Sequence, residues 1–240
     1  MSASPEIRVL PTPHALVEEA ARFVRDAAQQ AVADHNRFAL ALSGGETPQA
    51  LYALLAEAGP DTLPYNRVEI FWSDERGVPP DHEESNYGLA WKVWLARAPL
   101  DPRRIHRLRG EDDPERAAAD YEAELRRVLG DPPRLDLVLL GVGRDGHTAS
   151  LFPGEAALAS NRLVAAATAP VPPQRRITVT PRLIEAAARV LVLVTGRDKA
   201  EAVRRALEDA PTPAVPASLL RGPGITWFLD DAAASVLSPR

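Results

Sequence analysis

The chain has 240 residues, 45% of them hydrophobic and 25% charged, with a formal net charge of -5 and no cysteine. These values fit one globular domain over residues 1–240 in a reducing compartment such as the cytoplasm, and they exclude disulfides and thiol catalysis. The acidic balance argues against nucleic-acid or anionic-membrane partners, and the chain has neither a signal-peptide pattern nor an apolar run of the ~18 residues that a spanning helix needs.

Apolar runs and helical periodicity alternate along the chain. Strands are predicted at Glu6–Leu10, Phe38–Leu42, Arg67–Trp72, Arg104–Leu108, Leu135–Leu140, Arg162–Ala167, Arg176–Thr180, Arg189–Thr195 and Ile225–Leu229. Helices are predicted at Pro13–Asp34, Gln49–Ala58, Tyr87–Leu95, Asp113–Leu129 and Ala200–Leu207. This alternation predicts an α/β fold of three αβα layers, with a Rossmann-like, mostly parallel sheet covered by helices on both faces.

The strand Leu135–Leu140 is followed by a loop that carries Asp145, Gly146 and His147. In open α/β sheets, ligands bind beyond the carboxyl ends of the strands, so this His is placed for chemistry. Imidazole titrates near neutral pH and serves as a general base or acid. A hydrogen-bonded loop residue without chemistry is the alternative.

The same loop contains the pattern G-x-G-x-x-G at Gly141, Gly143 and Gly146. A dinucleotide site also needs an acidic residue about 20 positions later, at the end of the next strand. The next strand, Arg162–Ala167, contains neither Asp nor Glu. We therefore expect no nicotinamide cofactor.

A second loop, Ser43-Gly44-Gly45-Glu46-Thr47-Pro48, joins a buried strand to a helix. Glycines allow backbone N–H groups to approach a ligand, and a helix N-terminus favours a phosphate. The loop lacks the Walker lysine, which favours a sugar phosphate over a nucleotide. The alternative is an ordinary turn in which Thr47 caps the helix.

The third strand ends in a run of polar residues, Ser73-Asp74-Glu75-Arg76. Such a run is either a solvated loop or part of a site at the carboxyl edge of the sheet. Ser85 is predicted to cap the helix that follows it.

Other chemistries find little support in the sequence. Neither Ser43 nor Ser150 lies in G-x-S-x-G, which argues against a serine esterase. No H-E-x-x-H pattern or His cluster indicates a metal, so we expect neither a metal nor another cofactor.

Four blocks together resemble the 6-phosphogluconolactonases, within a wider group that includes glucosamine-6-phosphate deaminase. They are SGGETP at Ser43–Pro48, WSDERGVPPDHEESNYGLA at Trp72–Ala90, GVGRDGHTASLFPG at Gly141–Gly154 and RITVT at Arg176–Thr180. The blocks span nearly the whole chain, and the third is the most diagnostic. The deaminases carry Asn-Glu-Pro where this chain has Leu-Phe-Pro-Gly.

The resemblance implies a single lactonase domain that hydrolyses 6-phosphoglucono-δ-lactone in the oxidative pentose phosphate route. It implies that His147 is the catalytic base, with Asp145 beside it and Arg76 facing the lactone or the phosphate. The implied phosphate contacts are Ser43, Gly44, Gly45, Thr47, Arg176 and Lys199, and Asp74, Glu75 and Gly146 belong to the site loops. Arg175 is an alternative to Arg176 by a shift of one residue.

Two other functions stay open at this point. One is a deaminase that acts on an amino-sugar phosphate, and the other is a sensor that binds a sugar phosphate without chemistry. We expect a small sugar-phosphate lactone as the substrate and a monomer or small homo-oligomer.

Overall fold

A computed structural model describes residues 5–239, and its centre is a six-stranded parallel sheet in the order β1-β9-β8-β5-β2-β3. The strands are β1 (Glu6–Leu10), β2 (Phe38–Leu42), β3 (Val68–Trp72), β5 (Leu137–Leu140), β8 (Arg189–Val194) and β9 (Ile225–Asp230). Every pairing in this sheet is parallel. The expected α/β fold is confirmed.

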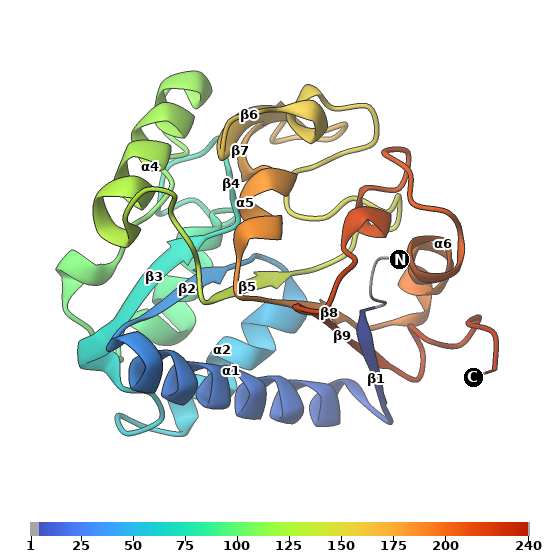
Figure 1. Cartoon of the computed structure of the whole chain (residues 1–240), viewed down its shortest axis with the longest axis horizontal. Coiled ribbons are helices and arrows are strands. Elements are labelled where there is room, and N and C mark those ends of the chain that lie inside the picture. The colour runs from blue at the N-terminus through green and yellow to red at the C-terminus, as the bar shows by residue number, and fades with distance from the viewer. Residues whose placement is uncertain (1–4, 240) are drawn as a thin grey trace.

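Helices cover both faces of the sheet. They are α1 (Pro13–His35), α2 (Glu46–Glu57), α3 (Asn86–Ala90), α4 (Pro114–Leu129), α5 (Pro181–Ala186) and α6 (Ala200–Glu208). In Figure 1, α1 and α2 lie below the sheet, whereas α4, α5 and a second sheet lie above it. The molecule therefore has the predicted layers, with one addition in the upper layer.

That addition is a three-stranded antiparallel sheet, which consists of β4 (Asp74–Arg76), β7 (Arg175–Val179) and β6 (Val164–Thr168) in that order. The strands predicted near β6 and β7 exist, but they pair with each other outside the parallel sheet. Strand periodicity identifies a strand without identifying its partner, which is why the sequence did not separate the two sheets.

The predicted strand Arg104–Leu108 is wrong. Asp101 caps a single helical turn, Pro102–Arg104, and only one bridge, between Ile105 and Ile70, joins this segment to the sheet. The Asp-Pro start of a turn outweighs the β-like pattern that follows it.

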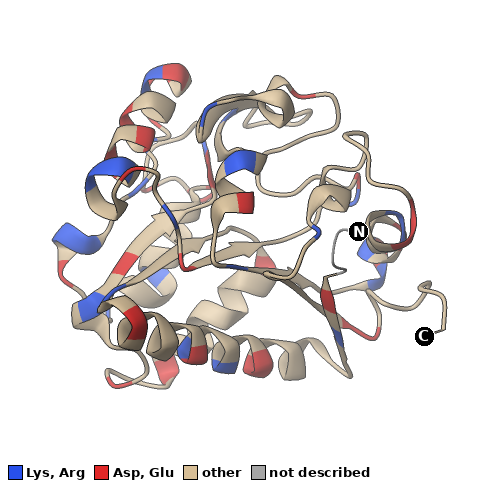
Figure 2. Cartoon of the chain, viewed as in Figure 1, with Lys and Arg blue, Asp and Glu red and all other residues tan. Residues whose placement is uncertain are grey.

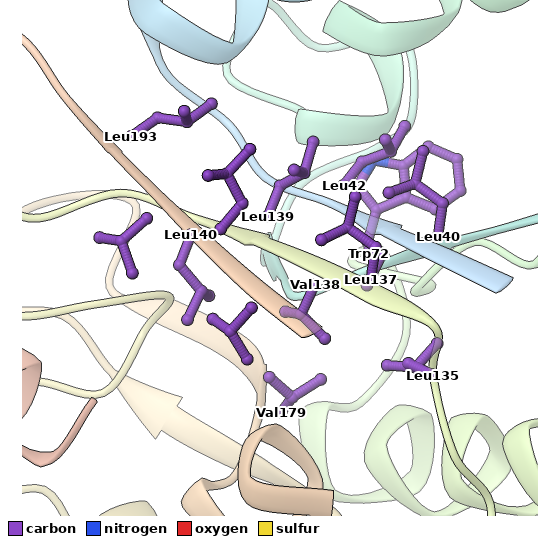
Figure 3. Close-up of a cluster of buried hydrophobic side chains, with 14 of the residues drawn as sticks. Leu40, Leu42, Trp72, Leu135, Leu137, Val138, Leu139, Leu140, Val179 and Leu193 are labelled. Carbon is purple, nitrogen blue, oxygen red and sulfur yellow. The ribbon is translucent and has the colours of Figure 1, made fainter. Parts of the chain in front are cut away.

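The core lies between the layers. All residues of β2, β3 and β5 are buried. Except for Glu69 they are apolar, because parallel strands covered on both faces need apolar side chains in both directions. Figure 3 shows side chains of β2, β5 and β8 gathered in one cluster with Trp72 and with Val179 of the small sheet. The two sheets thus share a core.

Charged residues lie mostly on the outer helices and loops, with both signs interleaved along α1 and α4 (Figure 2). Across residues 5–239, no helix is both long enough and apolar enough to cross a membrane.

The order of the strands creates a crevice at the carboxyl edge between β2 and β5. The next strand of this sheet after β2 is β3, which lies on one side, whereas the next one after β5 is β8, which lies on the other. In open α/β sheets, such a switch point is where ligands bind. The loops after β2 and β5, which carry two of the four sequence blocks, therefore flank this crevice.

One buried tyrosine holds α4 to the end of β3. The hydroxyl of Tyr121 accepts a hydrogen bond from the Trp72 backbone N–H at 2.7 Å and donates to the Trp72 carbonyl at 3.0 Å. Substitution Tyr121→Phe removes both bonds and leaves a buried N–H without a partner. We expect it to lower the free energy of unfolding by about 1–3 kcal/mol, measured by urea denaturation.

Tyr87→Phe is the matched control. The Tyr87 ring stacks on Trp91 at a centroid distance of 6.0 Å, and its hydroxyl has no hydrogen-bond partner among residues 5–239. The midpoint of urea denaturation of Tyr87→Phe should equal that of the wild type. Equal stability of Tyr121→Phe and the wild type would contradict the role given to this hydroxyl.

Candidate active site

A cavity of about 300 Å³ opens at the carboxyl ends of β2, β5 and β8. It is lined by residues of three loops and strand ends, namely Gly44, Gly45, Glu46, Thr47, Pro48, Gly141, Val142, Arg144, Leu193, Val194, Thr195, Asp198 and Lys199. Of the predicted phosphate contacts, Gly44, Gly45, Thr47 and Lys199 are brought together here.

The start of α2 faces this cavity without a side-chain cap. The N-cap residue is Gly45, whose φ of 105° is a conformation that glycine adopts without strain. The Thr47 hydroxyl lies 2.7 Å from the Thr195 hydroxyl, so the interpretation of Thr47 as the cap is wrong. With no side chain occupying them, the first N–H groups of the helix are open to an anion.

Ser43 lies behind the loop rather than in the cavity lining. Its backbone N–H and carbonyl both bond to the Tyr52 hydroxyl, at 3.0 and 2.7 Å, and its own hydroxyl is buried without a partner. At Gly44, a Cβ atom would lie 1.9 Å from Asn86 Oδ1, so only glycine allows this approach. The loop after β2 is thereby packed against Asn86.

His147 and Asp145 form a close pair on the loop after β5. Nδ1 of His147 lies 2.5 Å from Asp145 Oδ1, and the His147 backbone N–H donates to the same oxygen at 3.1 Å. An ionised carboxylate only accepts, so Nδ1 carries the proton and Nε2 of the neutral ring has the free lone pair. The side chain of His147 is 32% exposed, which lets water reach the ring.

The charge state of Asp145 follows from this contact. Partial burial raises the pKa of Asp145, but the hydrogen bonds and the charge of His147 outweigh it and hold that pKa below its ordinary value. Asp145 is therefore an anion at neutral pH. It can orient the imidazole and stabilise its protonated form.

The glycines of this loop serve the histidine. A Cβ atom at Gly143 would lie 2.1 Å from the His147 ring, and Gly146 adopts a φ of 86°. The next helical turn begins only at Ala156, so no helix N-terminus stands behind the glycines to receive a pyrophosphate. This geometry supports the expectation against a dinucleotide site.

Asp74 and Glu75 are buried, so the solvated-loop interpretation of this run is wrong. Asp74 accepts from the Ser150 hydroxyl at 2.7 Å and from Asn86 Nδ2 at 3.1 Å. Glu75 accepts from the backbone N–H groups of Asn86 and Tyr87 and from two further donors. Burial raises the pKa of Glu75. Both carboxylates hold neighbouring elements in place.

Arg76 and Arg176 stand directly opposite each other on β4 and β7. Arg176 is buried, and its Nε and Nη1 have no hydrogen-bond partner among residues 5–239, whereas Arg76 donates to the Glu84 carbonyl at 2.6 Å. Burial, together with the charge of Arg76, lowers the pKa of Arg176. Arg175 lies on the other face of β7 and is exposed. Arg176 is thus the arginine with buried donors to offer an anion.

The predicted residues therefore fall into three groups: residues that line the cavity, the His147–Asp145 pair, and the charged residues of the small sheet. Lys199 lines the cavity with the loop after β2, but Arg76, Arg176 and His147 do not line it. Contacts through Gly143, Ser150 and Asn86 connect the three groups.

The sequence reasoning missed Asn86 as a link, although its position directly after the helix cap Ser85 was a signal. Ser85 itself caps α3 as predicted, with its hydroxyl accepting from the Gly88 N–H at 3.0 Å. Among the described residues, no group of three or more His, Asp or Glu could hold a metal ion.

Comparison with known proteins gives the same assignment as the motifs. The family model of glucosamine-6-phosphate isomerases and 6-phosphogluconolactonases matches residues 11–227. A 6-phosphogluconolactonase of Nostoc sp. is 37% identical over 240 residues, which cover 97% of this chain and 98% of that protein.

Solved structures agree. The 6-phosphogluconolactonase from Trypanosoma cruzi matches with a TM-score of 0.87 and 29% identity, over 100% of this chain and 99% of that one. A monomeric glucosamine-6-phosphate deaminase matches with a TM-score of 0.83 and 26% identity, over 96% and 99%. The expectation drawn from the four sequence blocks is confirmed, and the chain belongs to the family of glucosamine-6-phosphate isomerases and 6-phosphogluconolactonases.

Proposed function

We propose that this protein is a carboxylic ester hydrolase that converts 6-phosphoglucono-δ-lactone to 6-phosphogluconate in the oxidative pentose phosphate route. The observation that carries the proposal is the His147–Asp145 pair, held on a loop whose first residues line the cavity at the switch point. The names of the relatives support the same activity. The cysteine-free composition supports work in a reducing compartment such as the cytoplasm.

In the proposed mechanism, Nε2 of His147 removes a proton from a water molecule while the water oxygen attacks the lactone carbonyl carbon. Asp145 stabilises the resulting imidazolium through Nδ1. When the tetrahedral intermediate collapses, the bond between C1 and the ring oxygen breaks, and the imidazolium returns its proton to that oxygen. One His thus serves both steps, and the single product carries a free hydroxyl group and a carboxylic acid group.

Cationic groups supply the remaining requirements. Arg76 is proposed to face the lactone end and stabilise its oxyanion, together with loop N–H groups. Lys199, Arg176 and the uncapped start of α2 are proposed to bind the phosphate. Binding energy at the phosphate end holds the carbonyl beside the attacking water.

The deaminase alternative draws on the likeness to the monomeric deaminase structure. Against it stands the continuation Leu151-Phe152-Pro153-Gly154, which has the lactonase pattern. The Phe152 ring packs against the His147 ring at a centroid distance of 4.6 Å, so this difference lies beside the proposed base. The sensor alternative gives the His147–Asp145 pair no purpose.

His147→Ala should reduce the lactone hydrolysis rate by ~10²–10⁴, to near the spontaneous rate, because the base is lost. The lactone is made in situ from glucose 6-phosphate, and acid release is followed below neutral pH. His35→Ala is the matched control, since His35 is exposed and contacts Asp136 directly before β5, at the opposite end of that strand from the His147 loop.

Acceleration that survives His147→Ala would overturn the mechanism but keep the activity. Absence of acceleration by the wild type, with ammonia released from glucosamine 6-phosphate, would favour the deaminase instead.

Lys199→Ala should raise KM far more than it lowers kcat. A charge-assisted hydrogen bond is worth about 1.5–3 kcal/mol, which corresponds to a rise in KM of about 10- to 150-fold. Initial rates at varied lactone concentration give the two constants separately. An unchanged KM would remove Lys199 from the phosphate site.

Arg176→Met should stabilise the fold while weakening phosphate binding. The substitution removes a buried cation that lacks partners and faces Arg76, so we expect the free energy of unfolding to rise by about 1 kcal/mol or more. Added inorganic phosphate should raise the denaturation midpoint of the wild type but not that of the variant.

Arg175→Met is the neighbouring control, because Arg175 is exposed on the opposite face of β7. It should leave the phosphate response intact. If Arg175→Met abolishes the response and Arg176→Met does not, the assignment is shifted by one residue.

A further inference from the structure

The charged side chains that line the cavity balance in number, although the cavity is proposed to bind a phosphate. Arg144 and Lys199 carry positive charge, and Glu46 and Asp198 carry negative charge. Beside the partial positive charge at the start of α2, such a balanced set of side chains attracts a dianion more strongly when its acids are paired with other groups. The arrangement of Arg144, Asp198 and Lys199 meets this condition for one acid.

The carboxylate of Asp198 lies between two cations from different loops. Its Oδ2 is 2.6 Å from Arg144 Nε, which is a hydrogen bond, but 3.7 Å from Lys199 Nζ, which is beyond hydrogen-bond distance. The hydrogen bond from Arg144, followed by the nearby charge of Lys199, holds the pKa of Asp198 below its ordinary value. Asp198 is therefore an anion that is paired chiefly with Arg144.

Arg144 lies between Gly143 and Asp145 on the loop that ends in His147, whereas Asp198 and Lys199 follow β8. The ion pair thus joins two of the loops that line the cavity. Both side chains are well exposed, at 76% for Arg144 and 44% for Asp198, so the pair adds little to folding stability. Its position points to a role in binding.

We propose that Arg144 sets the phosphate affinity of the cavity by holding Asp198 away from Lys199. Arg144 is a positioning residue in this proposal, because it acts through Asp198 rather than by contact with the ligand. Without Arg144, the nearest cation for Asp198 is Lys199, and the carboxylate then competes with the phosphate for the Lys199 ammonium. The inference rests on the proposed function, in which Lys199 binds the phosphate of the substrate.

The test is a double-mutant cycle on the full chain. The dissociation constants of inorganic phosphate and of 6-phosphogluconate are measured by calorimetry, and KM and kcat are measured with the lactone. Arg144→Gln should raise the dissociation constants and KM by about fivefold, the upper range for an exposed pair, with a smaller effect on kcat. Asp198→Asn should lower them.

The decisive variant is the double substitution Arg144→Gln with Asp198→Asn. With Asp198 neutral, this side chain no longer competes for Lys199, so loss of Arg144 should have little further effect on the dissociation constants. Arg144→Lys should restore most of the affinity, because an ammonium also pairs with Asp198. Arg197 is next to Asp198 in the sequence but does not line the cavity. Arg197→Gln removes the same charge as Arg144→Gln, and it should leave the affinity unchanged.

Three results would overturn the proposal. Arg144→Gln weakening binding by the same factor in the Asp198→Asn background would mean that Arg144 contacts the ligand or acts by charge alone. Equal weakening by Arg197→Gln would show a general field effect. No change in any variant would show that the pair does not influence binding.

The two proposals fail in distinguishable ways. A wild type that binds phosphate but does not accelerate lactone hydrolysis would refute the proposed function, while the series of dissociation constants still tests Arg144. A wild type that hydrolyses the lactone but binds neither inorganic phosphate nor 6-phosphogluconate would refute the phosphate site and with it the inference, while the proposed hydrolase activity would stand.

Discussion

The site depends on two buried carboxylates, Asp74 and Glu75, on the short strand β4 that follows the edge strand β3. A buried charge is tolerated only where hydrogen bonds replace water, so each carboxylate requires donors from other parts of the chain. Glu75 is held by the start of α3, and Asp74 is held by Asn86 and by Ser150 of the loop after β5. These bonds join the small sheet, α3 and the loop after β5 to the parallel sheet, and thereby fix the surroundings of His147.

The same small sheet holds a buried cation that has acids nearby but too few hydrogen-bond acceptors among residues 5–239. Arg176 faces Arg76 across β4 and β7, is buried, and has two guanidinium nitrogens without partners. Like charges directly opposite on a sheet destabilise it, and burial adds to the cost. Under the proposed function, an anion that binds to Arg176 would offset this destabilisation of the free protein. Functional sites are commonly destabilising in this way, because a group that already has good partners in the free protein gains less free energy when its ligand binds.

Much of this arrangement can be predicted from sequence patterns. The physical basis of those patterns also explains which parts cannot be predicted. Apolar runs such as Phe38–Leu42 indicate buried strands, and the ends of parallel strands meet at one edge, so the meeting of Gly44 with Lys199 could be predicted. Strand β4 could not, because three charged residues give no apolar pattern. The choice between Arg175 and Arg176 required the β4–β7 register, since adjacent residues on a strand face opposite ways.

The cations at the carboxyl edge lie in two places. Arg144 and Lys199 border the cavity beside the start of α2, whereas Arg76 and Arg176 stand on the small sheet, and neither of these lines that cavity. A phosphorylated lactone also needs positive charge in two places: permanently at its phosphate, and transiently at the carbonyl oxygen in the transition state. The first need is met by binding and the second only by groups fixed in advance. Under the proposed function, the exposed Arg144–Asp198–Lys199 group and the buried Arg176 both serve recognition of the phosphate. Arg76, whose guanidinium is tied to the Glu84 carbonyl, suits stabilisation of the oxyanion.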